Sequence, residues 1–384
     1  MHTSRLSDIA RIDRASLSSE KIQDGTLYLG LENIESGGNI IKVQTVENGE
    51  LKSSKFCFTP EHILYGKLRP YLAKITAPDF HGICSTDIIP VLPGPKVDRR
   101  YLLHFLRQDS MVEFATSRSS GANLPRLSPK ELANFQIPLP PLAEQKRIAA
   151  ILDAADELRA KRREAIAQLD VFLQSTFIEM FGDPVTNPMG WKQIELSSLV
   201  DASDRINYGV VQPGEEFPAG KPLIRVGDFV GGSIDFSGIK MIDPNIERKY
   251  QRSRLRGNEL LISCVGSIGT ICKVSSQAVG FNIARAVARV PLREEVSSDF
   301  MLYCLRSDVI QRYFLRETRT VSQPTLNISL IKAALVIQPP FDLQRRFATI
   351  VESVEQQKAR MQAHLAELDA LFVSLQHRAF NGEL

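Results

Sequence analysis

Two long stretches of the chain carry hydrophobic residues at alternating steps of four and three positions, over about residues 142–181 and 341–380. This 3.5-residue repeat is the pattern of a coiled-coil seam. It predicts two α-helices, each about 60 Å long at about 1.5 Å per residue. Helices this long most simply pack on each other as a spacer; the alternative is that each packs on its own domain. The expected seam residues are Ile148, Leu152, Ala155, Ile166, Leu169, Leu173, Phe347, Val351, Val354, Leu365, Leu368 and Phe372.

The second stretch repeats the first at a distance of 199 positions. Residues 137–152 read IPLPPLAEQKRIAAIL and residues 336–351 read VIQPPFDLQRRFATIV, so that Gln145 matches Gln344. Even the interruption of the seam repeats, with Arg159 matching Lys358. Both stretches follow a Pro-Pro pair, which suits the first turn of a helix. A repeat of this length indicates a duplicated domain-plus-helix unit, since solenoid repeats have only about 20–50 residues.

Each long helix is preceded by short hydrophobic runs that Gly, Pro, Asn and Asp interrupt, a pattern typical of short strands. The predicted fold class is therefore α+β. It consists of two mixed α/β domains separated by two long antiparallel helices that form a coiled-coil spacer, as a pseudo-two-fold tandem duplication. The expected boundaries are 1–140 and 184–338 for the domains and 141–183 and 339–384 for the helices. Strands are expected at 26–31, 40–46, 63–68, 88–92, 223–226, 260–265 and 286–290, and further helices at 101–115 and 300–315.

The composition is that of an ordinary globular protein, with 43% hydrophobic residues and a net charge of only +3. This charge argues against a histone-like nucleic-acid binder but allows a local basic face. The five cysteines form no CxxC pair, and we expect them to be small buried residues rather than zinc ligands. No hydrophobic run reaches the roughly 18 residues of a membrane span, and the N-terminus does not read as a signal peptide. The expected location is the reducing cytoplasm.

The familiar catalytic motifs are missing from the sequence. It contains no GxGxxG, no GxxxxGK[ST], no GxSxG and no HExxH. The QPPF segment at 338–341 resembles the amine-binding motif of DNA amino-methyltransferases, but it begins with Gln, and its counterpart at 139–142 reads LPPL. We interpret both segments as helix starts. No catalytic residue, metal site or cofactor is expected in this chain.

Basic residues gather in loop-like segments of both halves, together with short polar side chains that can bind phosphates and base edges. In the first domain the candidate DNA contacts are Lys67, Arg69, Tyr71, Lys74, Arg118, Ser119, Ser120, Asn123 and Arg126. In the second they are Arg248, Lys249, Arg252, Arg254, Arg256, Arg319, Thr320, Ser322, Gln323, Thr325 and Asn327. The alternative for each segment is a solvated loop, with Asn123 and Asn327 as turn residues. Because both copies place such a loop just before the Pro-Pro helix, we predict contact with double-stranded DNA.

The chain resembles the specificity subunit of type I restriction-modification enzymes. The resemblance rests on the paired segments PLPPLAEQKRIAAILDAAD and QPPFDLQRRFATIVESVE, the helix ends FGDP and FNGEL, and the Gly190-Trp191 opening of the second copy. It covers the whole chain and implies a non-catalytic DNA-recognition subunit, in which each target-recognition domain binds one half of a bipartite site. It also implies that the helices set the spacing of the halves and dock two modification (methyltransferase) subunits.

The same resemblance implies that the cofactors belong to partner chains. S-adenosylmethionine is expected in the methyltransferase subunits, and ATP with Mg²⁺ in the restriction (motor-nuclease) subunits. The residues leave two other functions open: a self-sufficient DNA-modifying enzyme, which the missing motifs disfavour, and a coiled-coil adaptor with two ligand-binding β-rich domains. A salt titration separates the adaptor from a DNA reader, because phosphate contacts make affinity fall steeply with salt.

Overall fold

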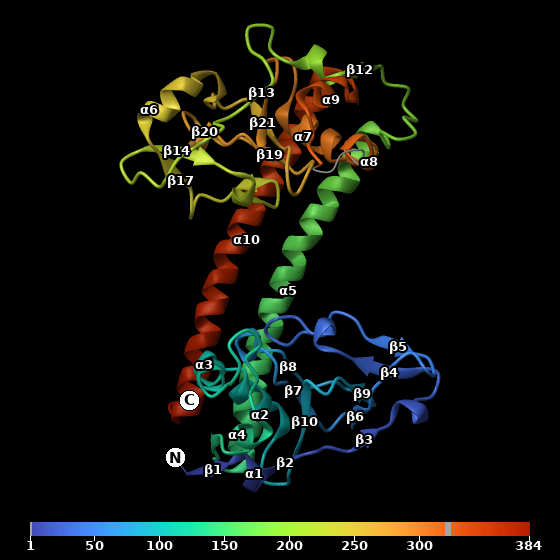
Figure 1. Ribbon diagram of the computed structural model, residues 1–384, viewed down its shortest axis with the longest axis vertical. Coiled ribbons are helices and arrows are strands. Elements are labelled where there is room, and N and C mark those ends of the chain that lie inside the picture. The colour runs from blue at the N-terminus through green and yellow to red at the C-terminus, as the bar shows by residue number, and fades with distance from the viewer. Residues whose placement is uncertain (1, 319–323) are drawn as a thin grey trace. The chain divides into compact units, whose positions relative to one another are not determined.

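The computed structural model describes residues 2–318 and 324–384, and the contacts of the chain divide it into two units (Figure 1). The first unit comprises Met1–Glu164 and Ala363–Leu384, and the second comprises Ala165–Gln362. The two long helices are α5 (Leu142–Phe181) and α10 (Phe341–Asn381), which confirms the helix extents expected from the hydrophobic pattern. Each unit therefore contains one mixed α/β domain together with part of α5 and part of α10.

The first domain is built from two main sheets and several short helices. One sheet has the order β2-β10-β7-β8 and is antiparallel; the other has the order β3-β6-β9-β4-β5 and contains the parallel pair β4–β9. Strand β1 pairs with β11, so the start of the domain is tied to the strand just before α5. The elements are β1 (Thr3–Arg5), α1 (Leu6–Ile9), β2 (Ala10–Ile12), β3 (Ser16–Leu17), β4 (Thr26–Leu29), β5 (Gln44–Val46), β6 (Lys55–Phe58), β7 (Ile63–Gly66), β8 (Ile75–Thr76), β9 (Gly82–Cys84), β10 (Ile88–Pro93), α2 (Arg99–Leu106), α3 (Asp109–Ser117), α4 (Pro129–Ala133) and β11 (Gln136–Pro138).

The second domain repeats the four-stranded sheet, the parallel pair and the strand pair before the long helix, but its second sheet, β17-β14-β20, has three strands instead of five. Its main sheet has the order β13-β21-β18-β19, its parallel pair is β14–β20, and β12 pairs with β22 just before α10. The matching strand order confirms the duplication inferred from the sequence. The elements are β12 (Gln193–Glu195), β13 (Asn207–Tyr208), β14 (Lys221–Ile224), β15 (Phe229–Val230), β16 (Ser233–Ile234), β17 (Lys240–Ile242), α6 (Pro244–Glu247), β18 (Glu259–Ser263), β19 (Ile271–Lys273), β20 (Asn282–Ile283), β21 (Val287–Pro291), α7 (Ser298–Arg306), α8 (Asp308–Thr318), α9 (Ile328–Ala333) and β22 (Leu335–Ile337).

The stretches expected to be helical at 101–115 and 300–315 are helical, but each forms two helices, α2–α3 and α7–α8. The breaks lie at Gln108 (φ −60°, ψ 141°) and Ser307 (φ −61°, ψ 150°), where the backbone is extended. Just before each break, an arginine side chain donates a hydrogen bond to a strand carbonyl: Arg107 to Ile75 (2.8 Å) and Arg306 to Ile271 (3.0 Å). These bonds are tertiary, so the hydrophobic pattern could not reveal the breaks.

A buried glutamine in the first turn of each long helix joins that helix to its domain. The Gln145 side chain donates to the carbonyls of Pro140 (2.8 Å) and Lys96 (3.1 Å) and accepts from the amide of Asp98 (2.8 Å). At the equivalent place, Gln344 donates to the Pro339 carbonyl (2.9 Å) and accepts from the Ser297 amide (3.1 Å). Asp98 and Ser297 are the N-caps of α2 and α7, so the glutamine connects two helix starts.

The predicted seam residues divide between the domain cores and the helix pair. Ile148, Leu152 and Phe372 are buried in the core of the first unit, and Leu173, Phe347 and Val351 in the core of the second. There α2 or α7 packs against both long helices, as when Phe380 lies against Tyr101 (5.1 Å between ring centroids). At the helix ends, the seam residues therefore pack into the domain cores, which is the alternative that the sequence left open. The positions that remain partly buried are Ala155, Ile166, Leu169, Val354, Leu365 and Leu368.

The interruption of both seams is a matched ion-pair cluster. In the first unit, Arg159 bonds to Asp369 (2.6 Å) and Asp156 (2.8 Å), and its guanidinium lies 4.2 Å from the Phe372 ring centroid. In the second unit, Lys358 bonds to Asp170 (2.7 Å) and Glu355 (3.1 Å). These residues correspond at the same distance of 199 positions. Their pairing shows that α5 and α10 run antiparallel within each unit.

Replacing the buried glutamines should weaken each unit separately. The changes Gln145→Leu and Gln344→Leu leave backbone groups at two helix starts without partners, which costs about 1–3 kcal/mol. Hydrogen exchange should show faster exchange at the starts of α2 and α5 for the first variant, and of α7 and α10 for the second. The exposed Gln357→Leu on α10 is the control and should change stability by less than about 0.5 kcal/mol. Unchanged protection from hydrogen exchange in both Gln145→Leu and Gln344→Leu would show that the glutamine side chain is dispensable.

Candidate nucleic-acid interface

In the first domain, the structure brings the two predicted basic segments together at the turn between β7 and β8. This turn, the first tip, comprises residues 67–73. The Lys67 amide donates to the Asp87 carbonyl (2.9 Å), and the Leu127 amide donates to the Lys67 carbonyl (2.9 Å). The Arg69 amide donates to the Pro125 carbonyl (2.7 Å). The loop at 118–126, which follows α3 in sequence, therefore lies directly against the first tip.

The exposed cations of this cluster are Arg69, Arg118 and Arg126. Arg118 is positioned by the Phe114 ring, whose centroid lies 5.1 Å from the guanidinium carbon. Lys67 (3.7 Å) and Arg126 (3.3 Å) both approach the Asp87 carboxylate, which partly neutralises them. Phosphate contact in this domain is thus best supported for Arg69 and Arg118.

Other predicted residues of the first domain have structural roles. The Lys74 ammonium donates to the Leu31 carbonyl (2.7 Å), and the Ser119 hydroxyl donates to the Ala115 carbonyl (2.8 Å). Ser120 and Arg126 exchange backbone hydrogen bonds, which shape the loop between them. Asn123 lies exposed in that loop. These contacts shape the surface that Arg69, Tyr71 and Arg118 present.

The second domain contains an equivalent turn that the sequence interpretation missed. It is the second tip, residues 264–269 between β18 and β19. The Cys264 amide donates to the Ala286 carbonyl (2.7 Å), and the Leu326 amide donates to the Cys264 carbonyl (2.9 Å). These bonds match those of Lys67 in the first tip. The second tip contains no cation, so a search for basic residues could not find it; its paired glycines were the available signal.

The predicted basic run of the second domain divides into exposed and internally paired residues. Arg248, Lys249 and Arg252 are exposed, form no ion pair within the described residues, and line a 550 Å³ pocket. Arg254 instead makes two hydrogen bonds (2.5 and 2.6 Å) to the buried carboxylate of Glu247. Arg256 lies 3.2 Å from Asp204, which also binds the buried Arg289. Arg254 and Arg256 therefore stabilise the domain.

Tyr208, a residue not predicted from the sequence, joins the basic run to the loop before α9. Its hydroxyl donates to the Leu326 carbonyl (3.1 Å) and accepts from the Ile328 amide (3.0 Å). The neighbouring Asn207 side chain donates to the Arg252 carbonyl (3.0 Å). Burial raises the pKa of Tyr208, so the phenol stays protonated and can donate.

The loop before α9 is described only in part. Asn327 is the N-cap residue of α9 and is exposed, and Thr325 lies beside it. Arg285, between β20 and β21, is a further exposed cation that the sequence interpretation missed. The predicted contacts Arg319, Thr320, Ser322 and Gln323 lie outside the described residues.

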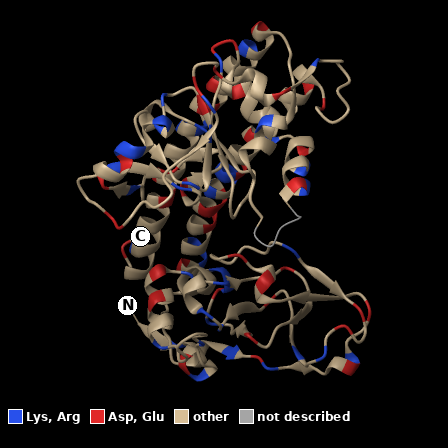
Figure 2. Ribbon diagram, turned by 45° about the horizontal axis from the view of Figure 1, so that its top comes forward, with Lys and Arg blue, Asp and Glu red and all other residues tan. Residues whose placement is uncertain are grey.

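Charges of both signs are interspersed over both domains (Figure 2). This agrees with the small net charge of +3 and means that the basic character is local to particular loops. It also explains why whole-chain charge was a weak indicator of a nucleic-acid partner.

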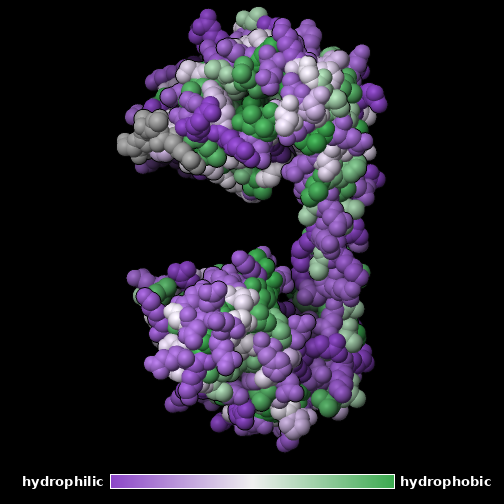
Figure 3. Space-filling model, turned by 90° about the vertical axis from the view of Figure 1, so that its right-hand side faces the viewer, coloured by the Kyte–Doolittle hydropathy of each residue, from purple (hydrophilic) through white to green (hydrophobic). Residues whose placement is uncertain are grey.

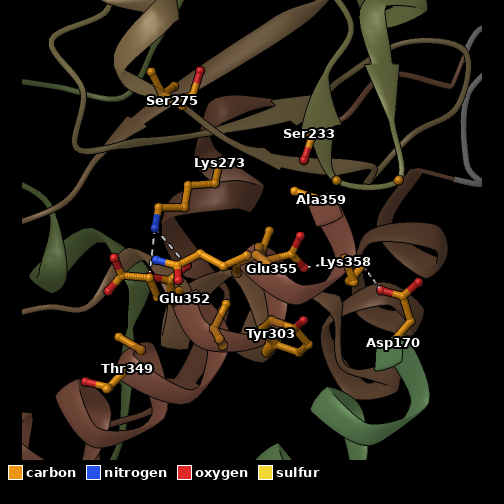
Figure 4. Close-up of a pocket in the computed structure, with 18 of the residues that line it drawn as sticks. Asp170, Ser233, Lys273, Ser275, Tyr303, Thr349, Glu352, Glu355, Lys358 and Ala359 are labelled. Carbon is orange, nitrogen blue, oxygen red and sulfur yellow. Dashed lines mark hydrogen bonds and ion pairs between the residues drawn. The ribbon is translucent and has the colours of Figure 1, made fainter. Parts of the chain in front are cut away.

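A pocket of 1040 Å³ opens in the second unit among α7, α10 and β19 (Figure 4). Lys273 bonds to Asp299 (2.7 Å), and Lys358 lies between Asp170 and Glu355. Since these charges neutralise one another, their evident role is to join the surrounding helices and strand.

Hydrophobic side chains remain exposed on the long helices. Phe172 on α5 and Leu371 on α10 are each 50% exposed and correspond at the distance of 199 positions. Phe177, by contrast, packs against Phe181 and Phe347 in the core of the second unit. Figure 3 shows hydrophobic residues gathered in patches within a largely hydrophilic surface. Further exposed members on the helices are Leu158, Val171, Ile178 and Val373.

The chain is similar to known proteins over most of its length. Residues 1–168 match the family described as Type I restriction modification DNA specificity domain. The chain is 30% identical to the type I restriction enzyme EcoBI specificity subunit of Escherichia coli, over 94% of this chain and 81% of that protein. It is 23% identical to the StySPI specificity subunit of Salmonella potsdam, over 90% and 82% of the two chains.

Two solved structures share the fold. The type I restriction-modification system S subunit from M. genitalium aligns with a TM-score of 0.58 at 16% identity, over 99% of this chain and 96% of that one. A chain from a study of complex assembly and conformational transition in the type I restriction-modification system aligns with a TM-score of 0.59 at 20% identity, over 100% and 98%.

The cysteines are free thiols, and four of the five are buried. Burial raises the pKa of Cys264, Cys272 and Cys304 to about 12. Within the described residues no three His, Cys, Asp or Glu side chains are grouped so as to hold a metal ion. In the same part of the chain, no helix is both long and apolar enough to cross a membrane.

Thiol alkylation should follow this burial. With a pKa of about 12, the reactive thiolate is on the order of one molecule in ten thousand at pH 8, and packing blocks access as well. Iodoacetamide and mass spectrometry should therefore show slow labelling of Cys264, Cys272 and Cys304 in the native chain, with the half-buried Cys57 labelled first. All five thiols should react in denaturant, which is the control. Rapid native labelling of Cys264 at pH 8 would contradict its burial.

Proposed function

Since this chain belongs to the type I restriction enzyme specificity subunits, we propose that each of its two domains binds one half of a bipartite DNA sequence. Members of this family supply DNA sequence specificity and are recognition subunits rather than enzymes. The proposal rests on the observation that the two tips are built in the same way. Equivalent backbone bonds hold both turns, while their side chains differ completely. Two domains that share a backbone framework but differ in their contact residues suit a DNA site whose two halves differ in sequence.

Phosphate binding is assigned to the exposed cations around the tips. Arg69 and Arg118 serve the first domain, and Arg248, Lys249 and Arg252 serve the second. Such contacts supply affinity and position the protein, whereas base edges supply the sequence information. Arg254 and Arg256 are not assigned to phosphate binding, because the carboxylates of Glu247 and Asp204 partly neutralise them.

The two long helices are assigned to spacing and assembly, with 1–140 and 184–338 as the DNA-reading domains. The exposed Phe172 and Leu371 occupy equivalent positions of the duplicated helices. An exposed apolar residue at the same position of both copies suits two identical partners, because pseudo-two-fold symmetry offers each of them an equivalent contact. We therefore assign to them two modification subunits that bind S-adenosylmethionine. Restriction subunits that use ATP and Mg²⁺ join this assembly, and its place is the cytoplasm, where the free thiols persist.

The affinity for DNA should fall as the salt concentration rises, and the exposed cations of the second domain should account for part of this dependence. Replacing Arg248, Lys249 and Arg252 with Ala should weaken binding to all sequences alike and flatten the plot of log affinity against log salt by about two to three units. Fluorescence anisotropy between about 50 and 200 mM salt measures this on the full chain assembled with its modification subunit.

The charge-matched control replaces Lys21, Lys42 and Lys52, three exposed lysines away from both tips, with Ala. It should leave the slope nearly unchanged. An equal loss in both triple variants would mean that the basic run has no special part in binding. A wild-type complex without any salt dependence would favour the adaptor function.

The length of the two long helices should set the length of the spacer between the two DNA half-sites. Inserting about four helix-forming residues into both α5 and α10, near their midpoints, adds about 6 Å to each helix. Methylome sequencing should then show a longer spacer between two unchanged half-sites. Insertion into α5 alone is the control and should disrupt the matched ion pairs and reduce methylation. A spacer of unchanged length in the double insertion would show that helix length does not set the distance between the half-sites.

A further inference from the structure

The two tips bend in the same way with different residues. In the first tip, Arg69 (φ 51°) and Ala73 (φ 47°) flank the 3₁₀ turn Pro70–Leu72. Left-handed backbone is uncommon for residues other than glycine. In the second tip, Gly266 (φ 77°) and Gly269 (φ 82°) take the corresponding places. The first domain therefore keeps the bend at some conformational cost, and strained residues of this kind cluster at functional sites.

Hydrogen bonds make both tips rigid. In the first, the Ala73 amide donates to the Pro70 carbonyl (2.8 Å), and the Leu72 carbonyl accepts from the Ser36 hydroxyl (2.9 Å). In the second, the Gly269 amide donates to the Ser263 carbonyl (2.9 Å), and the Gln311 side chain donates to the Gly269 carbonyl (3.1 Å). A rigid turn places its outermost side chain precisely, as the reading of a base edge requires.

Each tip presents one exposed polar side chain that carries no charge. Tyr71 is 51% exposed, and its hydroxyl has no hydrogen-bond partner in the part of the chain that is described. Ser267 is exposed in the second tip, and its hydroxyl likewise bonds to nothing within residues 2–318 and 324–384. By contrast, Lys67 and Lys74 beside Tyr71 are engaged with Asp87 and the Leu31 carbonyl. The outermost residue of each tip is thus free to bind a ligand.

We propose that Tyr71 and Ser267 are specificity-determining residues, each reading a base edge in the major groove of a different half-site. This rests on the proposed function and assigns base reading within the same interface. The tyrosine ring suits the methyl group of a thymine, and its hydroxyl can donate to or accept from a neighbouring base edge. The serine hydroxyl can make only the hydrogen bond to a base edge and not the apolar contact with a thymine methyl group. Arg69, which lies two residues before Tyr71 in the first tip, binds the adjacent phosphate.

The test uses the full chain expressed with its modification subunit in a host without other DNA methylation. Methylome sequencing gives the consensus of both half-sites for the wild type, Tyr71→Ala, Tyr71→Phe and Ser267→Ala. Tyr71→Ala should relax one or two adjacent positions of one half, with discrimination there falling roughly 5- to 150-fold. Tyr71→Phe should lose only the part due to the hydroxyl. Ser267→Ala should relax the other half only, so that each variant's unaffected half is its internal control.

Purified complexes provide a second measurement in case a variant methylates poorly. Competition binding to duplexes with each base substituted in turn measures discrimination without requiring methyl transfer. Wild-type discrimination in all three variants, or relaxation of the same half by Tyr71→Ala and Ser267→Ala, would overturn the proposal while leaving the proposed function intact. A wild-type complex that shows no base preference in either half would instead refute the proposed function.

Discussion

The buried side-chain amide of Gln145, and of Gln344 in the second copy, sets the direction in which each long helix leaves its domain. A carboxamide is uncharged and both donates and accepts, so it can satisfy carbonyls and an amide from separate segments at once. In this chain it joins the Pro-Pro turn before the helix to the N-cap of α2 or α7. The contacts further along α5 and α10, including the burial of Phe372 and Phe347, require this starting direction. The same amide thus joins each long helix to the domain that it follows.

Along the helices, specificity of pairing comes from charge as much as from apolar contact. Arg159 and Lys358 break the hydrophobic repeat, yet each binds an aspartate of the other helix within its unit. A purely apolar seam tolerates sliding by one heptad, whereas a half-buried cation must meet its carboxylate. The ends of the helices differ again, because there α2 and α7 contribute aromatic side chains to a shared core. The spacer is therefore built into both domains, and lengthening it requires matched changes in both helices.

The DNA-reading surface could be predicted only in part. Basic composition correctly drew attention to Arg69, Arg118, Arg248, Lys249 and Arg252 as exposed cations, and their contact with DNA remains a prediction. The same criterion also selected Arg254, whose guanidinium is paired with the buried carboxylate of Glu247. It missed the second tip entirely, because Ser267 and its flanking glycines carry no charge. Charge along a sequence shows where cations occur, but whether a carboxylate neutralises them depends on residues distant in the chain.

The sequence by itself determined the duplication, the extents of α5 and α10, and the α+β class, since these follow from periodicity and helix boundaries that neighbouring residues encode. The tertiary structure showed that the helical stretches at 101–115 and 300–315 are each broken in two, with an arginine beside each break bonded to a distant strand. It also decided which seam residues enter the domain cores and which turn projects from each sheet. Such choices depend on hydrogen bonds and burial between segments tens of residues apart, and no local pattern records them.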